Sequence, residues 1–159
     1  MKTILQLSVF LLISASSYAQ VVSLNSISLE AAKKIVAEAR KHGQSVNAPH
    51  GGPSIAIVDQ GGNLVYVERP ETTFAASAMV AYEKARTAAM FQQPSRNMEN
   101  AIKGGRAPLI TVGYNMLEGG VPIIYNGQII GAIGVSGAAS SQQDVEIAEV
   151  GAKTKLDSL

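Results

Sequence analysis

The pattern of hydrophobic and polar positions predicts a helix and then a β-hairpin in the first part of the chain. Apolar residues recur at helical spacing over Leu29–His42, with Ser28 placed to cap this helix and Gly43 placed to end it. Two short apolar runs follow, Ser54–Asp59 and Leu64–Arg69, and a glycine-containing turn separates them. Two apolar runs joined in this way are typical of a hairpin.

A long helix is expected from Thr72 or Thr73 to Phe91, and one of its faces carries a stripe of alanine. The members of the stripe recur at helical spacing: Ala78, Ala81, Ala85 and Ala88. Such small side chains let a helix axis lie close to whatever it covers. Pro94 ends this helix, and a short helix is predicted over Ser95–Lys103.

The rest of the chain predicts three more strands and a last helix. They are expected at Leu109–Gly113, at Val121–Tyr125, at Gln128–Val135 and from Ser140 or Ser141 to about Leu156. Hairpins rather than βαβ crossovers join most of the strands, which favours an α/β (α+β) domain with one mainly antiparallel sheet. One face of the last strand is built of small residues, so it could accept either the alanine helix or a flat ligand.

The first nineteen residues have the three parts of a secretory signal peptide. Lys2 supplies the positive charge, Ile4–Ile13 is a short apolar stretch, and small residues at Ser17 and Ala19 form the cleavage site. We therefore expect cleavage before Gln20, a single domain over residues 20–159, and a periplasmic or secreted location. No membrane association is expected after cleavage.

Composition excludes several kinds of site. The chain has no cysteine, so disulfides, thiolate nucleophiles, zinc–cysteine sites and covalent c-type haem are excluded. Its 13 basic and 12 acidic residues form no block of like charge, so the basic footprint of a nucleic-acid-binding protein is missing. A nearly neutral domain of this kind is expected to bind a small molecule or to associate with further copies of itself.

Few residues suggest chemistry. His50 lies in a glycine-rich loop from which it could bind a metal or haem iron, although a solvated loop histidine is the alternative. His42 is expected to have a structural role at the end of its helix. Four residues are candidate anion binders: Arg69, Lys84, Arg86 and Arg96. On a helix, Lys84 and Arg86 point about 200° apart, so at most one of them faces a given pocket. No set of titratable groups predicts a catalytic site, so the catalytic residues stay unknown.

Four stretches of the chain, taken together, resemble the GlcG/HbpS family, also called the haem-degrading or DUF336 family. They are Glu83–Phe91 with Pro94 and Ser95, Ser54–Asp59 with Gly61–Leu64, Gly119–Ile123, and Gly127–Gly137 with Gln143 and Asp144. The resemblance covers nearly all of the expected mature chain. It implies a profilin-like fold with a five-stranded antiparallel sheet, helices on both faces, and a tendency to form dimers or rings. Some members of the family bind haem, and one of these is exported and linked to redox sensing.

The resemblance therefore predicts an exported protein that binds haem or a related tetrapyrrole. A weak haem-degrading enzyme and an oligomeric interaction module without catalytic activity are the alternatives. Haem needs an apolar slot, cations for its propionates and an axial ligand. His50 is the expected iron ligand, and the other candidate ligand-binding residues are Lys84, Arg86, Thr87, Tyr82 and Met90.

Overall fold

Four antiparallel strands form the centre of the computed structural model, which describes residues 23–156. They are β1 (Ser54–Asp59), β2 (Leu64–Glu68), β3 (Gly120–Tyr125) and β4 (Gln128–Ser136). Their order in the sheet is β2-β1-β4-β3, and every neighbouring pair is antiparallel. The predicted antiparallel sheet is thus confirmed, with β2 and β3 as its edges. The expected signal peptide and its cleavage site lie outside the described residues.

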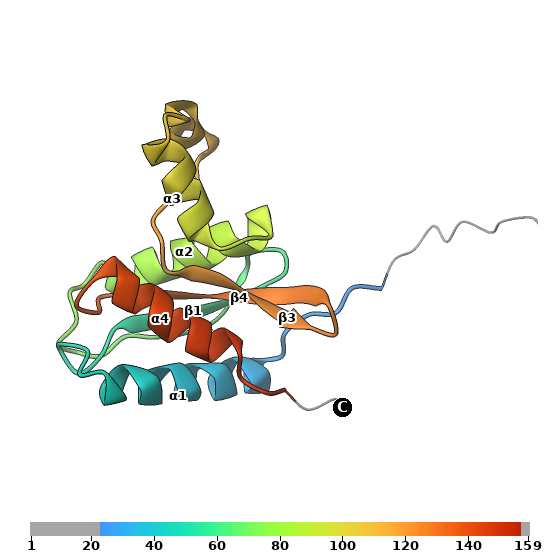
Figure 1. Cartoon of the computed structure of the whole chain (residues 1–159). Helices are drawn as coiled ribbons and strands as arrows, with labels where there is room; N and C mark the ends of the chain where they lie inside the picture. The colour runs from blue at the N-terminus through green and yellow to red at the C-terminus, as the bar shows by residue number, and fades with distance from the viewer. Residues whose placement is uncertain (1–22, 157–159) are drawn as a thin grey trace, which may run out of the picture.

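Helices cover both faces of the sheet (Figure 1). They are α1 (Leu29–Ser45), α2 (Ser77–Phe91), α3 (Ser95–Lys103), the 3-10 helix η1 (Ala107–Val112) and α4 (Ser141–Ala152). Helices α1 and α4 lie together on one face and α2 lies on the other, whereas α3 projects away from the sheet (Figure 1). Among the described residues, no helix is both long and apolar enough to cross a membrane.

The strand expected at Leu109–Gly113 is wrong, and for this reason the sheet has four strands instead of five. Residues Ala107–Val112 form η1, which buries none of its side chains. Pro108 lies in its first turn, and Gly113 ends it with a φ of 77°. Ile110 is 66% exposed, so this apolar run does not enter the core. The likeness to profilin stays an expectation from the resemblance.

Several predicted helix boundaries are also shifted. Gly43 does not end α1, because it packs against α4, where a Cβ atom would lie 3.4 Å from Cδ1 of Ile147. Helix α2 begins at Ser77, several residues later than expected, and α4 ends at Ala152. The Ser28 cap is confirmed, since its Oγ accepts a hydrogen bond from the Ala31 N–H.

The alanine face of α2 covers the small face of β4. Ala81, Ala85 and Ala88 are fully buried, whereas Ala78 is only partly buried. A Cβ atom on Gly134 would lie 2.0 Å from the Ala81 carbonyl oxygen, so only glycine permits this approach. Helix α2, and not a ligand, therefore occupies the small face of this strand.

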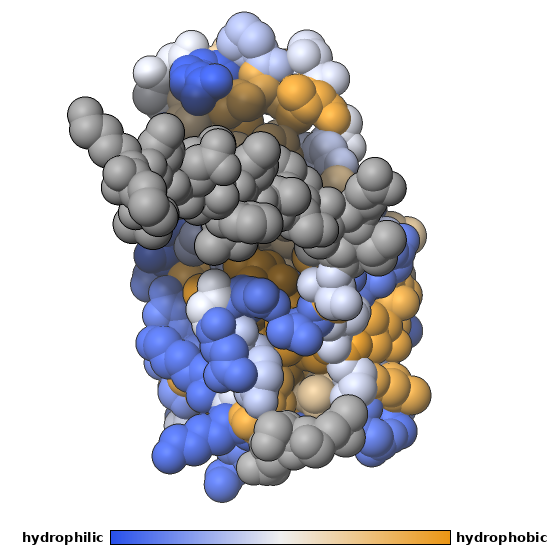
Figure 2. Space-filling model, turned by 90° about the vertical axis from the view of Figure 1, so that its right-hand side faces the viewer, coloured by the Kyte–Doolittle hydropathy of each residue, from blue (hydrophilic) through white to orange (hydrophobic). Residues whose placement is uncertain are grey.

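Apolar side chains also reach the surface. Figure 2 shows hydrophobic surface along the right-hand side of one face of the molecule and at its projecting end. The large apolar side chains exposed among the described residues include Leu64, Val67, Met79, Met90, Ile110 and Ile124.

Candidate functional site

An open cavity of about 450 Å³ lies at the end of the β1–β2 hairpin where β1 begins and β2 ends. Its wall combines apolar, cationic and anionic groups, the last from Glu68 and Glu71. Pro53 and Pro70 supply rigid apolar surface, and Arg40 of α1 and Arg69 supply two guanidinium groups. The wall thus carries two guanidinium groups and two carboxylates beside its apolar part, and one of each, Arg40 and Glu68, form an ion pair.

His50 is exposed and immediately precedes Gly51, which lines this cavity. It has a φ of 57°, and its carbonyl oxygen accepts a 2.5 Å hydrogen bond from Oγ1 of Thr72. The neighbouring loop is held in the same way, since Oγ1 of Thr73 donates to the carbonyl of Gly52 at 2.8 Å. The segment before α2 thus fixes the loop backbone while the imidazole of His50 faces solvent.

The charged groups of the cavity are held by contacts within the chain. Arg40 lies 2.5 Å from Oε2 of Glu68, and the hydroxyl of Tyr66 donates to Oε1 of Glu68 at 2.6 Å. This hydrogen bond is the main cause that raises the pKa of Tyr66. Arg69 donates to the carbonyl oxygen of Thr73 at 2.7 Å. Both arginines are therefore positioned at one end of the hairpin.

Three other candidate residues gather at the opposite end of the same hairpin, around its turn. A Cβ atom on Gly62 would lie 3.1 Å from Cγ of Arg86 and 3.2 Å from Sδ of Met90. The hydroxyl of Tyr82 lies 3.5 Å from the Gly62 carbonyl oxygen. The guanidinium of Arg86 lies 4.9 Å from the ring centroid of Tyr114, in a cation–π contact.

Within one chain, His50 and Arg86 are not neighbours. His50 precedes the start of β1, and Arg86 lies beside the turn that follows the end of β1. Since β1 has six residues, the two ends of the hairpin are about 20 Å apart. The single chain therefore divides the predicted ligand site between two places.

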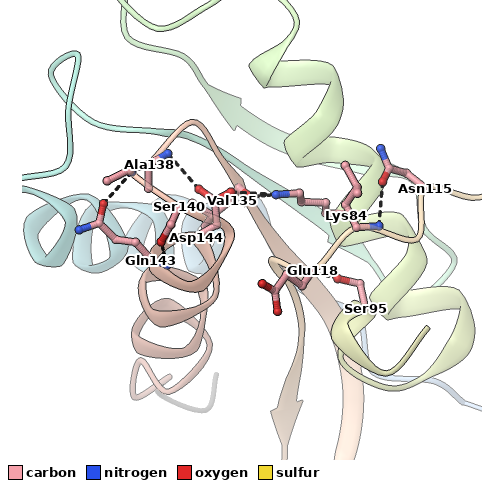
Figure 3. A network of polar contacts seen from close by, with 12 residues as sticks. Lys84, Ser95, Asn115, Glu118, Val135, Ala138, Ser140, Gln143 and Asp144 are labelled. Atoms are coloured by element: carbon pink, nitrogen blue, oxygen red, sulfur yellow. Dashed lines mark hydrogen bonds and ion pairs between the residues drawn. The ribbon is translucent and has the colours of Figure 1, made fainter. Parts of the chain in front are cut away.

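Lys84 and Thr87 lie on the buried side of α2. Nζ of Lys84 is 2.8 Å from Oδ2 of Asp144 and donates to the carbonyl of Val135 at 3.0 Å (Figure 3). The side chains of Lys84 and Asp144 are only 4% and 7% exposed. Oγ1 of Thr87 donates to the carbonyl of Asn115 at 2.7 Å. The ammonium group of Lys84 is thus engaged inside the protein.

Asp144 completes a buried polar network that joins α2, β4 and α4 (Figure 3). Its Oδ1 accepts a 3.0 Å hydrogen bond from the N–H of Ala138. Burial raises the pKa of the Asp144 carboxyl, and the nearby Lys84 ammonium opposes that rise. Sequence reasoning did not find this pair, although helical spacing places Lys84 beside the buried Ala81, Ala85 and Ala88.

His42, the second histidine of the chain, has the structural role expected of it. Its Nε2 lies 2.9 Å from Oε1 of Glu146 and so links α1 to α4. Within residues 23–156, no three or more histidine, aspartate and glutamate side chains lie together as a metal site would need.

Residues 27–153 match the family model described as Haem degrading protein HbpS-like. The chain belongs to the HbpS-like family. Protein GlcG of Escherichia coli K12 is 37% identical to this HbpS-like protein over 111 residues, which are 69% of this chain and 81% of GlcG. The resemblance found in the four sequence stretches is thus confirmed.

Two solved structures have a similar fold. Protein ORFY of Klebsiella pneumoniae superposes on this HbpS-like chain with a TM-score of 0.77 and 27% identity, over 86% of this chain and 95% of ORFY. A double mutant of Streptomyces reticuli HbpS superposes with a TM-score of 0.75 and 28% identity, over 87% and 92% of the two chains.

Proposed function

We propose that this HbpS-like protein is an exported protein that binds haem or a related tetrapyrrole in the cavity beside His50. One observation carries the proposal: the exposed His50 directly precedes Gly51, which lines a cavity of about 450 Å³ whose wall includes two guanidinium groups. Membership of a family described as haem-degrading supports the choice of ligand. The proposal concerns binding, and the expected location is the periplasm or the extracellular space.

The residues of the cavity fit the chemical parts of haem. The flat ring needs apolar surface, which the half-buried Pro70 would offer beside the buried Pro53. The two propionates need cations, for which Arg69 and Arg40, the latter paired with Glu68 in this structure, are the candidates. Haem would supply an iron that accepts a nitrogen donor from the protein. His50 would be that donor, because its side chain is exposed and its loop is rich in glycine.

The structure changes which cations are proposed to hold the propionates. Lys84 is buried against Asp144, and Arg86 lies at the far end of the hairpin. Arg40 and Arg69 instead line the same cavity that Gly51 lines. They therefore replace Lys84 and Arg86 as the proposed propionate partners within one chain.

A titration of the purified mature protein with haemin tests this proposal. We expect a saturable shift of the Soret band. His50→Ala should move its maximum and weaken binding about tenfold or more, as loss of a metal ligand does. His42→Ala is the matched control, because it removes the other histidine, which pairs with Glu146, and should leave the spectrum unchanged. A wild-type protein that gives no saturable shift contradicts the proposal.

The same preparation tests haem degradation. A reductant is added to the haemin complex, and loss of the Soret band is compared with loss in a solution of free haemin. A bound haem that decays no faster than free haemin agrees with a binding protein. Faster decay that depends on His50 would instead favour the weak haem-degrading enzyme.

A further inference from the structure

The two edge strands, β2 and β3, differ in whether their outward-facing backbone N–H groups are protected from pairing with another chain. On β3, the N–H of Gly120 donates to Oγ of Ser95 at 2.9 Å, and Pro122 has no N–H to donate. Proline and local hydrogen bonds of this kind protect an edge strand from pairing with another chain. The sequence of β2, Leu64–Glu68, contains neither proline nor lysine.

The register shows which backbone groups of β2 point outward. In an antiparallel ladder, successive residues point their N–H and C=O groups alternately to one neighbour and to the other. The N–H of Val135 donates to the carbonyl of Gly119 beside β3, so the next residue, Gly134, points to β1. Gly134 faces Ala56, which therefore points to β4. Val67 is the β2 partner of Ala56, so its N–H and C=O point away from the sheet.

The side chains along this edge are apolar and accessible. Leu64 is 50% exposed and Val67 is 37% exposed. Both face the same side of the sheet as α2, because their β1 partners, Val58 and Ala56, belong to that side. The edge thus combines free backbone groups with an apolar rim.

We propose that β2 pairs antiparallel with β2 of a second copy of this chain. The pairing would make one continuous sheet of eight strands, four from each copy. A second copy fits this edge because an antiparallel edge is complementary to itself about a two-fold axis, so one surface supplies both partners. The nearly balanced charge of the chain, formally +1, adds little repulsion between copies.

The pairing has a consequence for the ligand, and this part rests on the proposed function. In an antiparallel pair, the end of one β2 lies beside the beginning of the other. The cavity next to His50 is at the end of β2, and the cluster of Tyr82, Arg86 and Met90 is beside the turn before β2 begins. The dimer thus brings the partner's Arg86 and the partner's Met90 to the end of the hairpin that carries His50. In the dimer, the two halves of the predicted ligand site would thus lie together, one half from each copy.

The mass of the mature protein in solution, measured by light scattering at about 100 µM, tests the pairing. Val67→Pro removes an outward N–H and leaves the bonds between β1 and β2 intact, and Val67→Lys places a charge on the edge. We expect the wild type to be a dimer or a multiple of one, and both variants to have half its mass or less. Ile124→Lys on β3 and Ile110→Lys on η1 are matched controls on other exposed apolar positions, and each should keep the wild-type mass.

Two results overturn the pairing. One is a monomeric wild type at this concentration. The other is a wild-type mass in both Val67 variants, whether or not a control variant dissociates. The melting curve of each variant shows that it is folded, so a change of mass reports assembly. None of these readings depends on haemin, so they stand if the proposed function fails.

Mixing two defective variants tests the shared site. His50→Ala and Arg86→Ala proteins are each titrated with haemin, then unfolded together in equal amounts, refolded and titrated again. A dimer that contains one copy of each has one site with both residues intact, so about a quarter of all sites should regain wild-type affinity. No gain over the separate variants, when the wild type binds haemin, overturns the sharing.

Discussion

Nζ of Lys84 lies 2.8 Å from Oδ2 of Asp144, and both side chains are almost completely buried. A buried charge that loses its partner is costly, whereas removal of both charges often costs little. Lys84→Met should therefore lower the free energy of unfolding by about 3–5 kcal/mol. The double variant Lys84→Met, Asp144→Asn should lose less than the single variant, because its asparagine retains an oxygen for the Ala138 N–H.

Denaturant unfolding of the single and double variants measures this difference. Lys103→Met is the control. Lys103 is mostly exposed in its pair with Glu99, so its loss should change the free energy of unfolding little. Additive losses from Lys84 and Asp144 would contradict the expected coupling.

The same pair makes a prediction about pH. Burial raises the pKa of Asp144, and Lys84 opposes that rise, so Lys84→Met should raise this pKa further. A carboxyl whose folded pKa exceeds its unfolded pKa favours folding most when it is protonated. The destabilisation by Lys84→Met should thus shrink as the pH falls from 7 towards the unfolded pKa of about 3.9. Unfolding curves at several pH values test this, and a constant destabilisation would count against it.

Close packing between α2 and β4 predicts that Ala85→Leu is destabilising. Ala85 is fully buried, and its Cβ lies 3.0 Å from the position of a Cβ atom on Gly134. A larger side chain overpacks this contact and should cost about 1–3 kcal/mol. Ala78→Leu on the same helix is the control, because Ala78 is only partly buried. Thermal melting distinguishes the two, and an unchanged curve for Ala85→Leu would mean that this face of α2 is not packed.

The proposed role of Arg40 predicts an effect on affinity without an effect on the iron. Arg40→Gln should weaken haemin binding several-fold and leave the Soret maximum in place, since a propionate contact does not touch the metal. The loss should be smaller at high salt, where exposed charges are screened. Lys41→Gln on the same helix is the control, because Lys41 does not line the cavity. A shifted Soret maximum in Arg40→Gln would argue against a propionate contact.

The expected signal peptide predicts the mass of the mature protein. Expression of the full chain in a bacterium that exports proteins should give a product that begins at Gln20, with a free or cyclised N-terminus. Ala19→Arg should block the cleavage and retain the leader, because small residues are needed at that position. A mature product that still contains residues 4–13 would contradict export by cleavage.

The regular elements with a strong pattern were predictable from the sequence. The two hairpins and the helices α1, α2, α3 and α4 lie close to their expected positions, because side-chain periodicity, caps and turn residues agree there. The strand predicted at residues 109–113 was wrong. A short apolar segment can form either a strand or a helical turn, and its surroundings determine which of the two it forms. Here it projects from the sheet with α3 and has no partner strand.

The candidate site was predictable only in part. Helical spacing could have placed Lys84 on the buried side of α2, but no local pattern identified Asp144, sixty positions later, as its partner. The separation of His50 from Arg86 depends on the direction and length of β1. Arg69 was a candidate anion binder from the sequence, but Arg40 was not, because its place beside Arg69 depends on how α1 and the end of β2 meet in space.

The protected β3 edge limits the number of chains that can join through their sheets. A subunit that could join neighbours at both sheet edges would add further subunits without end, as in a fibre. Here Pro122 and the Ser95–Gly120 hydrogen bond leave one edge inert, so each subunit has a single joint of this kind. Polymerisation through the sheet then stops at two chains, and any larger ring must be assembled through a different surface. The proposed pairing would thereby cover the apolar β2 edge and keep the protein from seeding its own aggregation.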